Sequence, residues 1–308
     1  MRIAVLGLGR MGAAIAERLL LADHELTVWN RSAAATEPFA ARGVRVAGAP
    51  AEIWRHADVA ITMLADGPAL EQVVGGEGGL IAGLADAAGD AAADAQADAA
   101  PTRARTVIDM GTVGADTSAR VAERLAAHDV ALLRAPVSGN PSVVAAGNLA
   151  IVVSGPRDRF DALAPALADI GPHLHYVGAE EQARVVKLAL NLMLAGTTQL
   201  LAEALVLLEA EGVERAAALG VIGGSAVGSP FVRYKSEALI ADDYASTFTA
   251  ELMRKDLELA LAAGRAASVP LPLTAATTQL YNGAIAQGMG QLDLTALLPR
   301  LRREAGLD

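Results

Sequence analysis

The beginning of the chain constrains the fold more than any other stretch. Residues 2–7 form a short β-favouring run, an apolar helical pattern follows, and 24–31 read as a second strand. The turn between the first strand and the helix consists of Gly7, Leu8, Gly9, Arg10, Met11 and Gly12. In such a G-x-G-x-x-G turn the glycines allow a tight turn, backbone approach to a pyrophosphate, and close packing of helix on strand. Because the helix N-terminus also offers unpaired N–H groups, this stretch predicts a dinucleotide-binding βαβ unit rather than a merely tight turn.

The residues that end the second predicted strand indicate which dinucleotide binds. They are Asn30, Arg31 and Ser32. An NAD site usually places an acidic residue about 20 residues after the glycines to hold the ribose hydroxyls, and this chain has no acid there. A guanidinium group fits a 2′-phosphate, which a carboxylate would repel. We therefore predict NADP(H) as cofactor, with a solvent-facing Arg31 as the alternative interpretation.

Strand and helix patterns alternate as far as residue 178, and only helical patterns follow. The further predicted strands lie at 58–64, 106–112, 131–137, 148–155 and 173–178. Such alternation predicts an α/β fold with a doubly wound, mostly parallel sheet of the Rossmann type. We expect an NADP-binding Rossmann domain at 1–178 and an all-α domain for substrate binding and dimerisation at 179–308. A long interdomain helix would lead into the second domain.

That long helix is predicted between Gly178 and Gly212, a stretch without proline that is rich in Ala and Leu. Polar residues interrupt its apolar run, which argues against a membrane span. Lys187 and Asn191 stand four residues apart and therefore share one face. The lysine either extends to the surface from an apolar helix or lies at a site where burial disfavours its charge and suits it to proton transfer.

Composition limits the partners of the chain. It has 25 basic and 35 acidic residues, a net charge of −10 and no basic run, which argues against nucleic acid and anionic membranes as partners. The absence of Cys excludes disulfides, cysteine nucleophiles and thiolate metal sites. We interpret His173 and His175 as surface residues of one strand and predict no metal site. Met1 leads directly into a strand, so we expect a cytoplasmic protein, and we assign no function to the Ala/Asp-rich stretch 84–104.

Four motifs together resemble one family, the β-hydroxyacid dehydrogenases, which includes 3-hydroxyisobutyrate dehydrogenase and the glyoxylate and succinic semialdehyde reductases. GLGRMG resembles the family's GLGxMG, and APVSGN at 135–140 resembles its APVSGG substrate loop. Gly178, Lys187 and Asn191 match its helix motif GxxxxxxxxKxxxN. FTAELMRKDLELAL at 248–261 is similar to its late F…KDLxLA motif. The resemblance extends, in order, over essentially the whole chain.

The resemblance implies a role for each matched residue. Ser138 and Gly139 would bind a substrate carboxylate, Lys187 would be the catalytic acid or base, and Asn191 would contact the substrate. Besides the glycine turn and the Asn30–Ser32 segment, the implied cofactor contacts are Leu64, Ala65, Thr112 and Lys255. The implied activity is NADP-dependent hydride transfer between the nicotinamide and a small hydroxyacid or semialdehyde. The apolar long helix suggests packing between subunits, so we expect a homodimer or homotetramer.

Two residues depart from the family pattern. Arg134 stands where an acid usually precedes APVSG, and Asn140 replaces the second glycine of the loop. Both touch the predicted substrate loop, so the sequence leaves the substrate open. Two other functions also remain open. One is imine reduction by the same architecture, although imine reductases typically lack the lysine, and the other is a non-catalytic NADP-binding protein.

Overall fold

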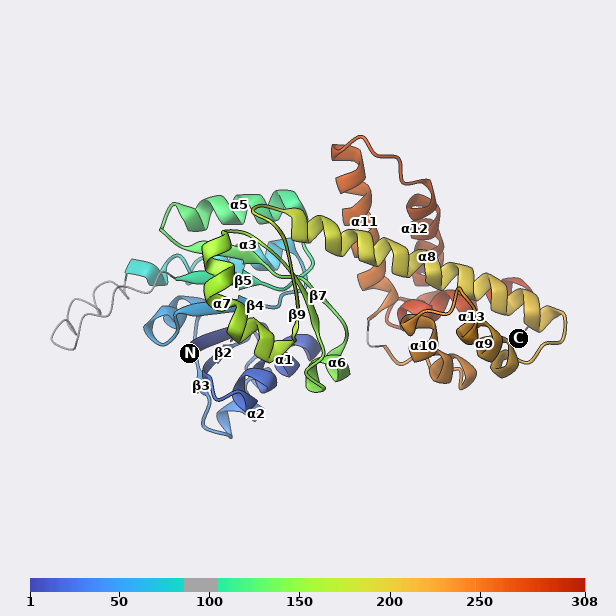
Figure 1. Cartoon of the computed structure of the whole chain (residues 1–308), viewed down its shortest axis with the longest axis horizontal. Coiled ribbons are helices and arrows are strands. Elements are labelled where there is room, and N and C mark those ends of the chain that lie inside the picture. Colours follow the sequence, from blue (N-terminus) through green and yellow to red (C-terminus); the bar gives the residue numbers. More distant parts are fainter. Residues whose placement is uncertain (86–104, 247, 308) are drawn as a thin grey trace. The chain divides into compact units, whose positions relative to one another are not determined.

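The computed structural model describes residues 1–85, 105–246 and 248–307. The chain forms two compact units, Met1–Lys187 and Leu188–Asp308, and the division falls within helix α8 (Gln182–Ala210) (Figure 1). Residues 86–104 of the Ala/Asp-rich stretch lie outside the described residues.

The first unit is built on one sheet, to which the described residues contribute nine strands in the order β3-β2-β1-β4-β5-β6-β8-β7, with β9 beside β8. The strands are β1 (Arg2–Leu6), β2 (Glu25–Trp29), β3 (Arg45–Val46), β4 (Val59–Thr62), β5 (Thr106–Asp109), β6 (Ala131–Arg134), β7 (Val137–Ser138), β8 (Ala150–Ser154) and β9 (His173–Gly178). The strands from β3 to β6 pair in parallel, whereas β8 runs antiparallel to β6 and β7. The predicted doubly wound, mostly parallel sheet is therefore confirmed.

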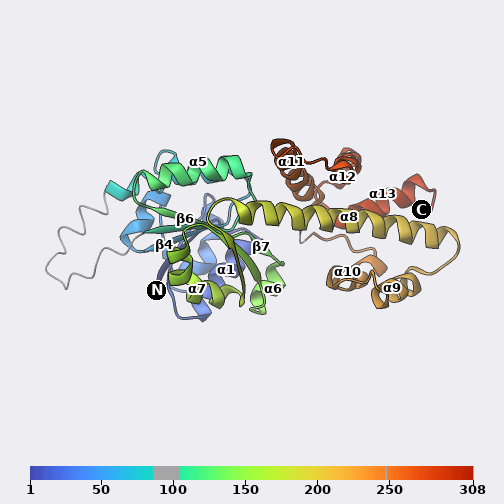
Figure 2. The same ribbon diagram turned by 45° about the horizontal axis from the view of Figure 1, so that its top comes forward.

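Helices cover both faces of this sheet, as Figure 2 shows. Along β1, Ile3 and Val5 pack into one core cluster and Ala4 and Leu6 into another, because successive side chains of a strand point to opposite faces. The first cluster includes side chains of α1 (Arg10–Leu21) and α7 (Arg157–Ile170). The second includes side chains of α3 (Gly67–Gly75) and α5 (Ala115–Ala126). Burial on both faces explains why these strands read as continuous apolar runs.

The chain order of the strands reverses at β1, which pairs with β2 on one side and β4 on the other. In open α/β sheets, ligands bind outside the carboxyl ends of the strands at such a switch point. Gly7 follows β1 with φ of +97°, and a Cβ on it would lie 2.5 Å from the Met63 carbonyl oxygen. A Cβ on Gly12 would lie 1.9 Å from the Gly7 carbonyl oxygen. Glycine at these two positions therefore allows α1 to begin directly against β1 and β4.

Short elements escaped the sequence prediction. They are β3, α2 (Glu37–Ala40), α6 (Pro141–Ala145) and the 3-10 turns η1 (Ala33–Ala35) and η2 (Pro50–Arg55). Elements of two to six residues are too short to display a clear period of hydrophobicity. The strand predicted at 131–137 is divided into β6 and β7, and Pro136 lies between them. Proline has no N–H to donate to a strand ladder, which accounts for the interruption.

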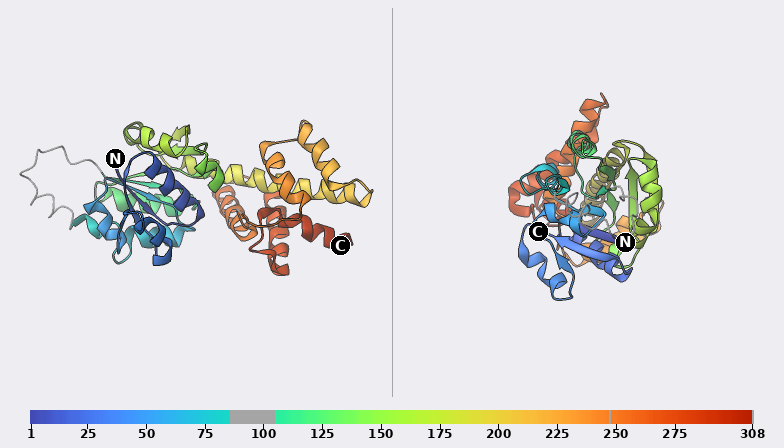
Figure 3. Two further views of the ribbon diagram at one scale, coloured as in Figure 1. Left: turned by 90° about the horizontal axis from the view of Figure 1, so that it is seen from below. Right: turned by 90° about the vertical axis from the view of Figure 1, so that its left-hand side faces the viewer.

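The described part of the second unit is helical, as predicted, and α8 is its longest element. The other elements are α9 (Arg215–Gly224), α10 (Pro230–Ile240), α11 (Ala250–Ala266), α12 (Pro272–Ala284), the π-helix η3 (Ile285–Met289), the 3-10 turn η4 (Leu294–Ala296) and α13 (Leu297–Glu304). The pair α9 and α10 lies on one side of α8 and the pair α11 and α12 on the other (Figure 3, left). Side chains of all these helices share one core cluster.

Helix α8 has two apolar sides with different surroundings. Ala195, Leu201 and Leu205 belong to the core of the second unit. Met193 and Leu200, which stand seven residues apart, are 65% and 60% exposed. By length and composition α8 is the described helix that could cross a membrane, and 44% of its apolar window is buried inside the protein. One side of α8 therefore belongs to the core of the second unit, and another side carries an exposed apolar stripe.

Candidate functional site

The glycine turn is held to the end of β2 by Asn30. The backbone N–H of Leu8 donates to Asn30 Oδ1 over 2.9 Å, and Asn30 Nδ2 donates to the Ser32 carbonyl over 3.0 Å. Asn30 therefore stabilises the turn itself, a role that a sequence motif for cofactor selectivity does not reveal. Arg31 and Ser32 follow it and are exposed.

The space in front of the turn is open at Gly9. A Cβ on Gly9 would meet no heavy atom within 4 Å, so the first residue before α1 borders open space. Arg10 is exposed and Met11 is half-buried at the start of the helix. An open helix N-terminus with a glycine beside it is the arrangement that admits a pyrophosphate close to backbone N–H groups. The geometry at Gly9 is therefore compatible with a phosphate close to the start of α1.

Two further loops lie at the same edge of the sheet. Leu64 and Ala65 come shortly after β4, and Thr112 follows β5 after Met110 and Gly111. Because β1, β4 and β5 are parallel neighbours, these loops and the glycine turn all follow the carboxyl ends of their strands. The loops pack closely, since a Cβ on Gly111 would lie 2.9 Å from the Leu64 carbonyl oxygen. The structure brings the predicted cofactor residues of the first unit to one edge.

The predicted substrate loop contains β7 and the start of α6. Ser138 is exposed, and Gly139 has φ of +148°, where a Cβ would meet Leu149 Cδ1 at 2.8 Å. Asn140 caps α6, because its Oδ1 accepts from the Val143 N–H over 3.1 Å and from Ser142 Oγ over 2.6 Å. The φ of Asn140 is −132°, which any residue adopts, so glycine is not needed there. The departure at Asn140 therefore serves the helix cap.

Arg134 is directed into the protein, where it pairs with Glu181 just before α8. Its Nε donates to Glu181 Oε1 over 2.8 Å, and its Nη2 donates to the same oxygen. The Arg134 side chain is 8% exposed. The second departure from the family pattern therefore forms a buried ion pair, and the guanidinium is engaged within the protein.

Lys187 and Asn191 share one face of α8, as their spacing predicts. Lys187 is half-buried, whereas Asn191 is 4% exposed. Asn191 Nδ2 donates to Asp256 Oδ2 over 2.5 Å, and Lys255 Nζ lies 3.0 Å from Asp256 Oδ1. Asp256 thus joins two of the predicted site residues in the second unit. In the sequence, Asp256 stands out only as the acid that follows Lys255. Its burial in α11 is seen in the structure.

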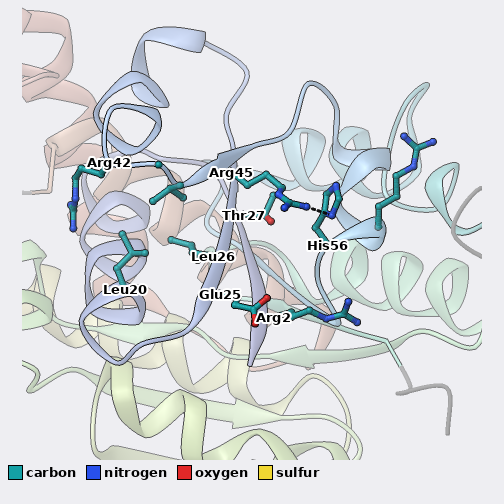
Figure 4. Close-up of a pocket in the computed structure, with 11 residues that line it drawn as sticks. Arg2, Leu20, Glu25, Leu26, Thr27, Arg42, Arg45 and His56 are labelled. Carbon is teal, nitrogen blue, oxygen red and sulfur yellow. Dashed lines mark hydrogen bonds between the residues drawn. The ribbon is translucent and has the colours of Figure 1, made fainter. Parts of the chain in front are cut away.

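A pocket of about 550 Å³ lies elsewhere in the first unit, beside the amino ends of β1 and β2 (Figure 4). Its four arginines are nearly balanced by acids, since Arg2 pairs with Asp58 and Arg42 with Glu17, and Glu25 also lines the pocket. Burial, followed by the positive charge of Arg45, lowers the pKa of His56. The predicted cofactor residues follow the opposite, carboxyl ends of these strands, so this pocket is a separate feature.

The two parts of the chain match two known protein families. Residues 2–178 match the NAD binding domain of 6-phosphogluconate dehydrogenase, and residues 182–301 match the family described as NAD-binding of NADP-dependent 3-hydroxyisobutyrate dehydrogenase. The chain belongs to the β-hydroxyacid dehydrogenase family. It is therefore an oxidoreductase that uses a nicotinamide cofactor.

Individual relatives cover nearly all of the chain. An oxidoreductase of Bacillus subtilis, YfjR, is 32% identical and covers 97% of this chain and 99% of its own. Glyoxylate/succinic semialdehyde reductase 1 of Arabidopsis thaliana is 28% identical, with 98% and 99% covered. The structure of 3-hydroxyisobutyrate dehydrogenase from Mycobacterium tuberculosis, with L-serine, has a TM-score of 0.78, 28% identity and coverage of 97% and 98%. Both halves of this chain therefore occur in its relatives, in the same order.

Proposed function

We propose that this protein uses NADP(H) to interconvert a small carboxylate-bearing semialdehyde and its hydroxyacid, with Lys187 as general acid and base. The observation that carries the proposal is the pair Lys187 and Asn191 on one face of α8, with Asn191 held by Asp256. A half-buried lysine beside a fixed amide provides a proton donor and a hydrogen-bonding group for the same substrate oxygen. The Arabidopsis relative, named for glyoxylate and succinic semialdehyde, supports the substrate class.

Each residue has a distinct task in this reaction. The cofactor, when bound, supplies or accepts the hydride at the substrate carbon. In the reductive direction Lys187 donates a proton to the carbonyl oxygen, and in the oxidative direction it takes the proton of the hydroxyl. Asn191 orients that oxygen, because the hydrogen bond to Asp256 fixes the amide. Backbone N–H groups at Ser138 and Gly139 would hold the substrate carboxylate.

Selectivity for NADP(H) is proposed from the end of β2. Arg31 is exposed there, and the adjacent Asn30 uses its side chain to hold the glycine turn. No acidic residue stands at 30–32 to repel a 2′-phosphate. The guanidinium of Arg31 would pair with that phosphate.

The proposal is tested with Lys187→Ala, assayed by NADPH oxidation against semialdehydes, α-keto acids and cyclic imines. General acid–base catalysis contributes about 10²–10⁴-fold, so kcat for carbonyl reduction should fall by that factor while the Kd for NADPH stays within about twofold. Val185→Ala is the matched control, because Val185 is exposed on another side of the same helix. It should retain wild-type kcat.

Each alternative function gives a different result in this assay. An imine reductase would turn over the imines and keep that activity in Lys187→Ala. A non-catalytic binding protein would bind NADPH but oxidise it with no substrate of the panel. Undiminished carbonyl reduction by folded Lys187→Ala would show that the lysine does not transfer the proton.

A further inference from the structure

Two buried ion pairs within the first unit link the start of α8 to the sheet. Arg184 in the first turn of the helix pairs with Asp109 at the end of β5. Glu181, just before the helix, pairs with Arg134 at the end of β6. Arg184 stands three residues before Lys187, so the two share a side of the helix. The first turn of α8, which these ion pairs hold, thus leads directly to the proposed catalytic lysine.

Arg184 is the more deeply buried of the two arginines, with 1% of its surface exposed. Its Nη2 donates to Asp109 Oδ2 over 2.5 Å and its Nη1 to the Gly111 carbonyl over 2.8 Å. Its Nε contacts Ser118 Oγ at 3.3 Å. Three separate acceptors therefore fix the guanidinium plane, which a flexible single-point charge could not match.

Asp109, the partner of Arg184, is fixed from a second direction. It is fully buried, and its other carboxylate oxygen accepts from Thr62 Oγ1 over 2.5 Å. Thr62 ends β4, so the network connects α8 with two neighbouring strands. A buried carboxylate with both oxygens engaged holds one geometry, because any displacement leaves a polar group unpaired.

The pair of Arg134 and Glu181 adds a second point of attachment. Both donors of the guanidinium that reach Glu181 contact Oε1, and the Glu181 side chain is 19% exposed. The Glu181 carbonyl also accepts the N–H of Arg184 over 3.0 Å and therefore takes part in the first helical turn. An acid at position 134 would face the Glu181 carboxylate. The arginine at 134 and the glutamate at 181 are complementary.

We propose that Arg184 and Glu181 are positioning residues for Lys187, an inference that rests on the proposed function. Asp109 and Gly111 lead to Thr112 of the predicted cofactor edge, and Arg134 leads to Ser138 of the substrate loop. The two ion pairs thus connect three segments of the first unit that carry predicted site residues. The ion pairs set the rotation and axial position of the start of α8 against β5 and β6, which end at Asp109 and Arg134. Small displacements of a reacting group, of about 1 Å, can lower the rate by about 10²-fold.

The test uses Arg184→Lys and the exchange of charges between Arg134 and Glu181. Arg184→Lys keeps the charge but cannot reach three acceptors, so kcat should fall about 10- to 100-fold, with the Kd for NADPH within about twofold. In Arg134→Glu, kcat should fall by a similar factor. The double variant Arg134→Glu with Glu181→Arg should recover at least about a third of wild-type kcat. The pH at which kcat is half-maximal should shift in Arg184→Lys, because the surroundings of Lys187 change in this variant.

A purely structural role is distinguished by Arg215→Lys. Arg215 is also a largely buried arginine, and it pairs with Glu209 near the other end of α8. This control should lower the melting temperature without changing kcat or its pH profile. If Arg184→Lys behaves like Arg215→Lys when assayed well below its melting temperature, the positioning role is overturned. If the double variant recovers no more activity than Arg134→Glu, the pairing of 134 with 181 is overturned.

Lys187→Ala, measured in parallel, separates this inference from the proposed function. A Lys187→Ala variant with wild-type kcat would refute the proposed function. A strongly impaired Lys187→Ala together with unaffected, folded Arg184→Lys would refute only the positioning role.

Discussion

Alanine at Gly9 and at Gly12 should separate cofactor binding from folding, although the two glycines stand three residues apart. A Cβ on Gly12 would lie 1.9 Å from the Gly7 carbonyl oxygen and 3.0 Å from its carbon, both rigid backbone atoms. Gly12→Ala must therefore displace α1 from β1. A Cβ on Gly9 meets nothing within 4 Å, and φ of −65° with ψ of −176° is allowed for alanine. Gly9→Ala should fold normally but place a methyl group where the pyrophosphate approaches.

The magnitudes follow from these geometries. Overpacking typically costs about 1–3 kcal/mol, and a clash with backbone belongs at the upper end. For a unit of this size, each kcal/mol lowers Tm by about 2–4 °C, so Gly12→Ala should melt about 5–10 °C lower. Gly9→Ala should stay within about 0.5 kcal/mol of wild type. Loss of one charge-assisted hydrogen bond to phosphate, about 1.5–3 kcal/mol, predicts about 10–150-fold weaker NADPH binding by Gly9→Ala.

Thermal unfolding followed by circular dichroism and titration of NADPH by calorimetry measure the two quantities separately. In the apo protein Tm should fall only in Gly12→Ala, whereas Gly9→Ala should keep its Tm and bind NADPH more weakly. Wild-type NADPH affinity in Gly9→Ala would contradict the placement of the pyrophosphate at this turn. An unchanged Tm in Gly12→Ala would contradict the close approach of α1 to β1.

Three other measurements test separate features. Arg31→Ala should raise KM for NADPH about 10–150-fold and leave KM for NADH nearly unchanged; equal use of both cofactors by wild type would refute the role of Arg31. Sedimentation should show a homodimer or larger assembly, with Leu200→Glu shifting it toward the 31.4 kDa monomer by charging the exposed stripe of α8; a monomeric wild type at micromolar concentration would contradict it. Because the folded protein lowers the pKa of His56 below 6.5, unfolded chains bind its proton first on acidification, so stability should fall from pH 6.5 downward. His56→Gln should reduce that decline in Tm, and an unaltered pH dependence would exclude a contribution from this residue.

The sequence contained most of the architecture because the signals for it are local. Periodicity and flanking glycines place β1 and α8 within a few residues of their observed ends. The elements that it missed, such as β3 and α6, are held by their neighbours and are too short for a periodic pattern.

The candidate site likewise contains residues that the sequence predicted and roles that only the structure shows. Motif spacing singled out Lys187, Asn191 and the glycine turn, because i and i+4 on a helix, or a strand-to-helix turn, are defined by neighbouring residues alone. The roles of Asn30 in bracing the turn and of Asn140 in capping α6 came only from the side-chain contacts.

Sequence alone therefore determined that this chain forms a Rossmann-type unit followed by helices, with a lysine and an asparagine on the long helix. Only the tertiary structure decided which groups fix those residues. Arg184 and Asp109 lie 75 positions apart, and Asn191 and Asp256 lie 65 apart. Such pairs leave no periodic trace in the sequence, because each partner alone looks like a charged or polar residue placed at a costly position. Their burial becomes favourable only when folding supplies the opposite charge or hydrogen-bond partner.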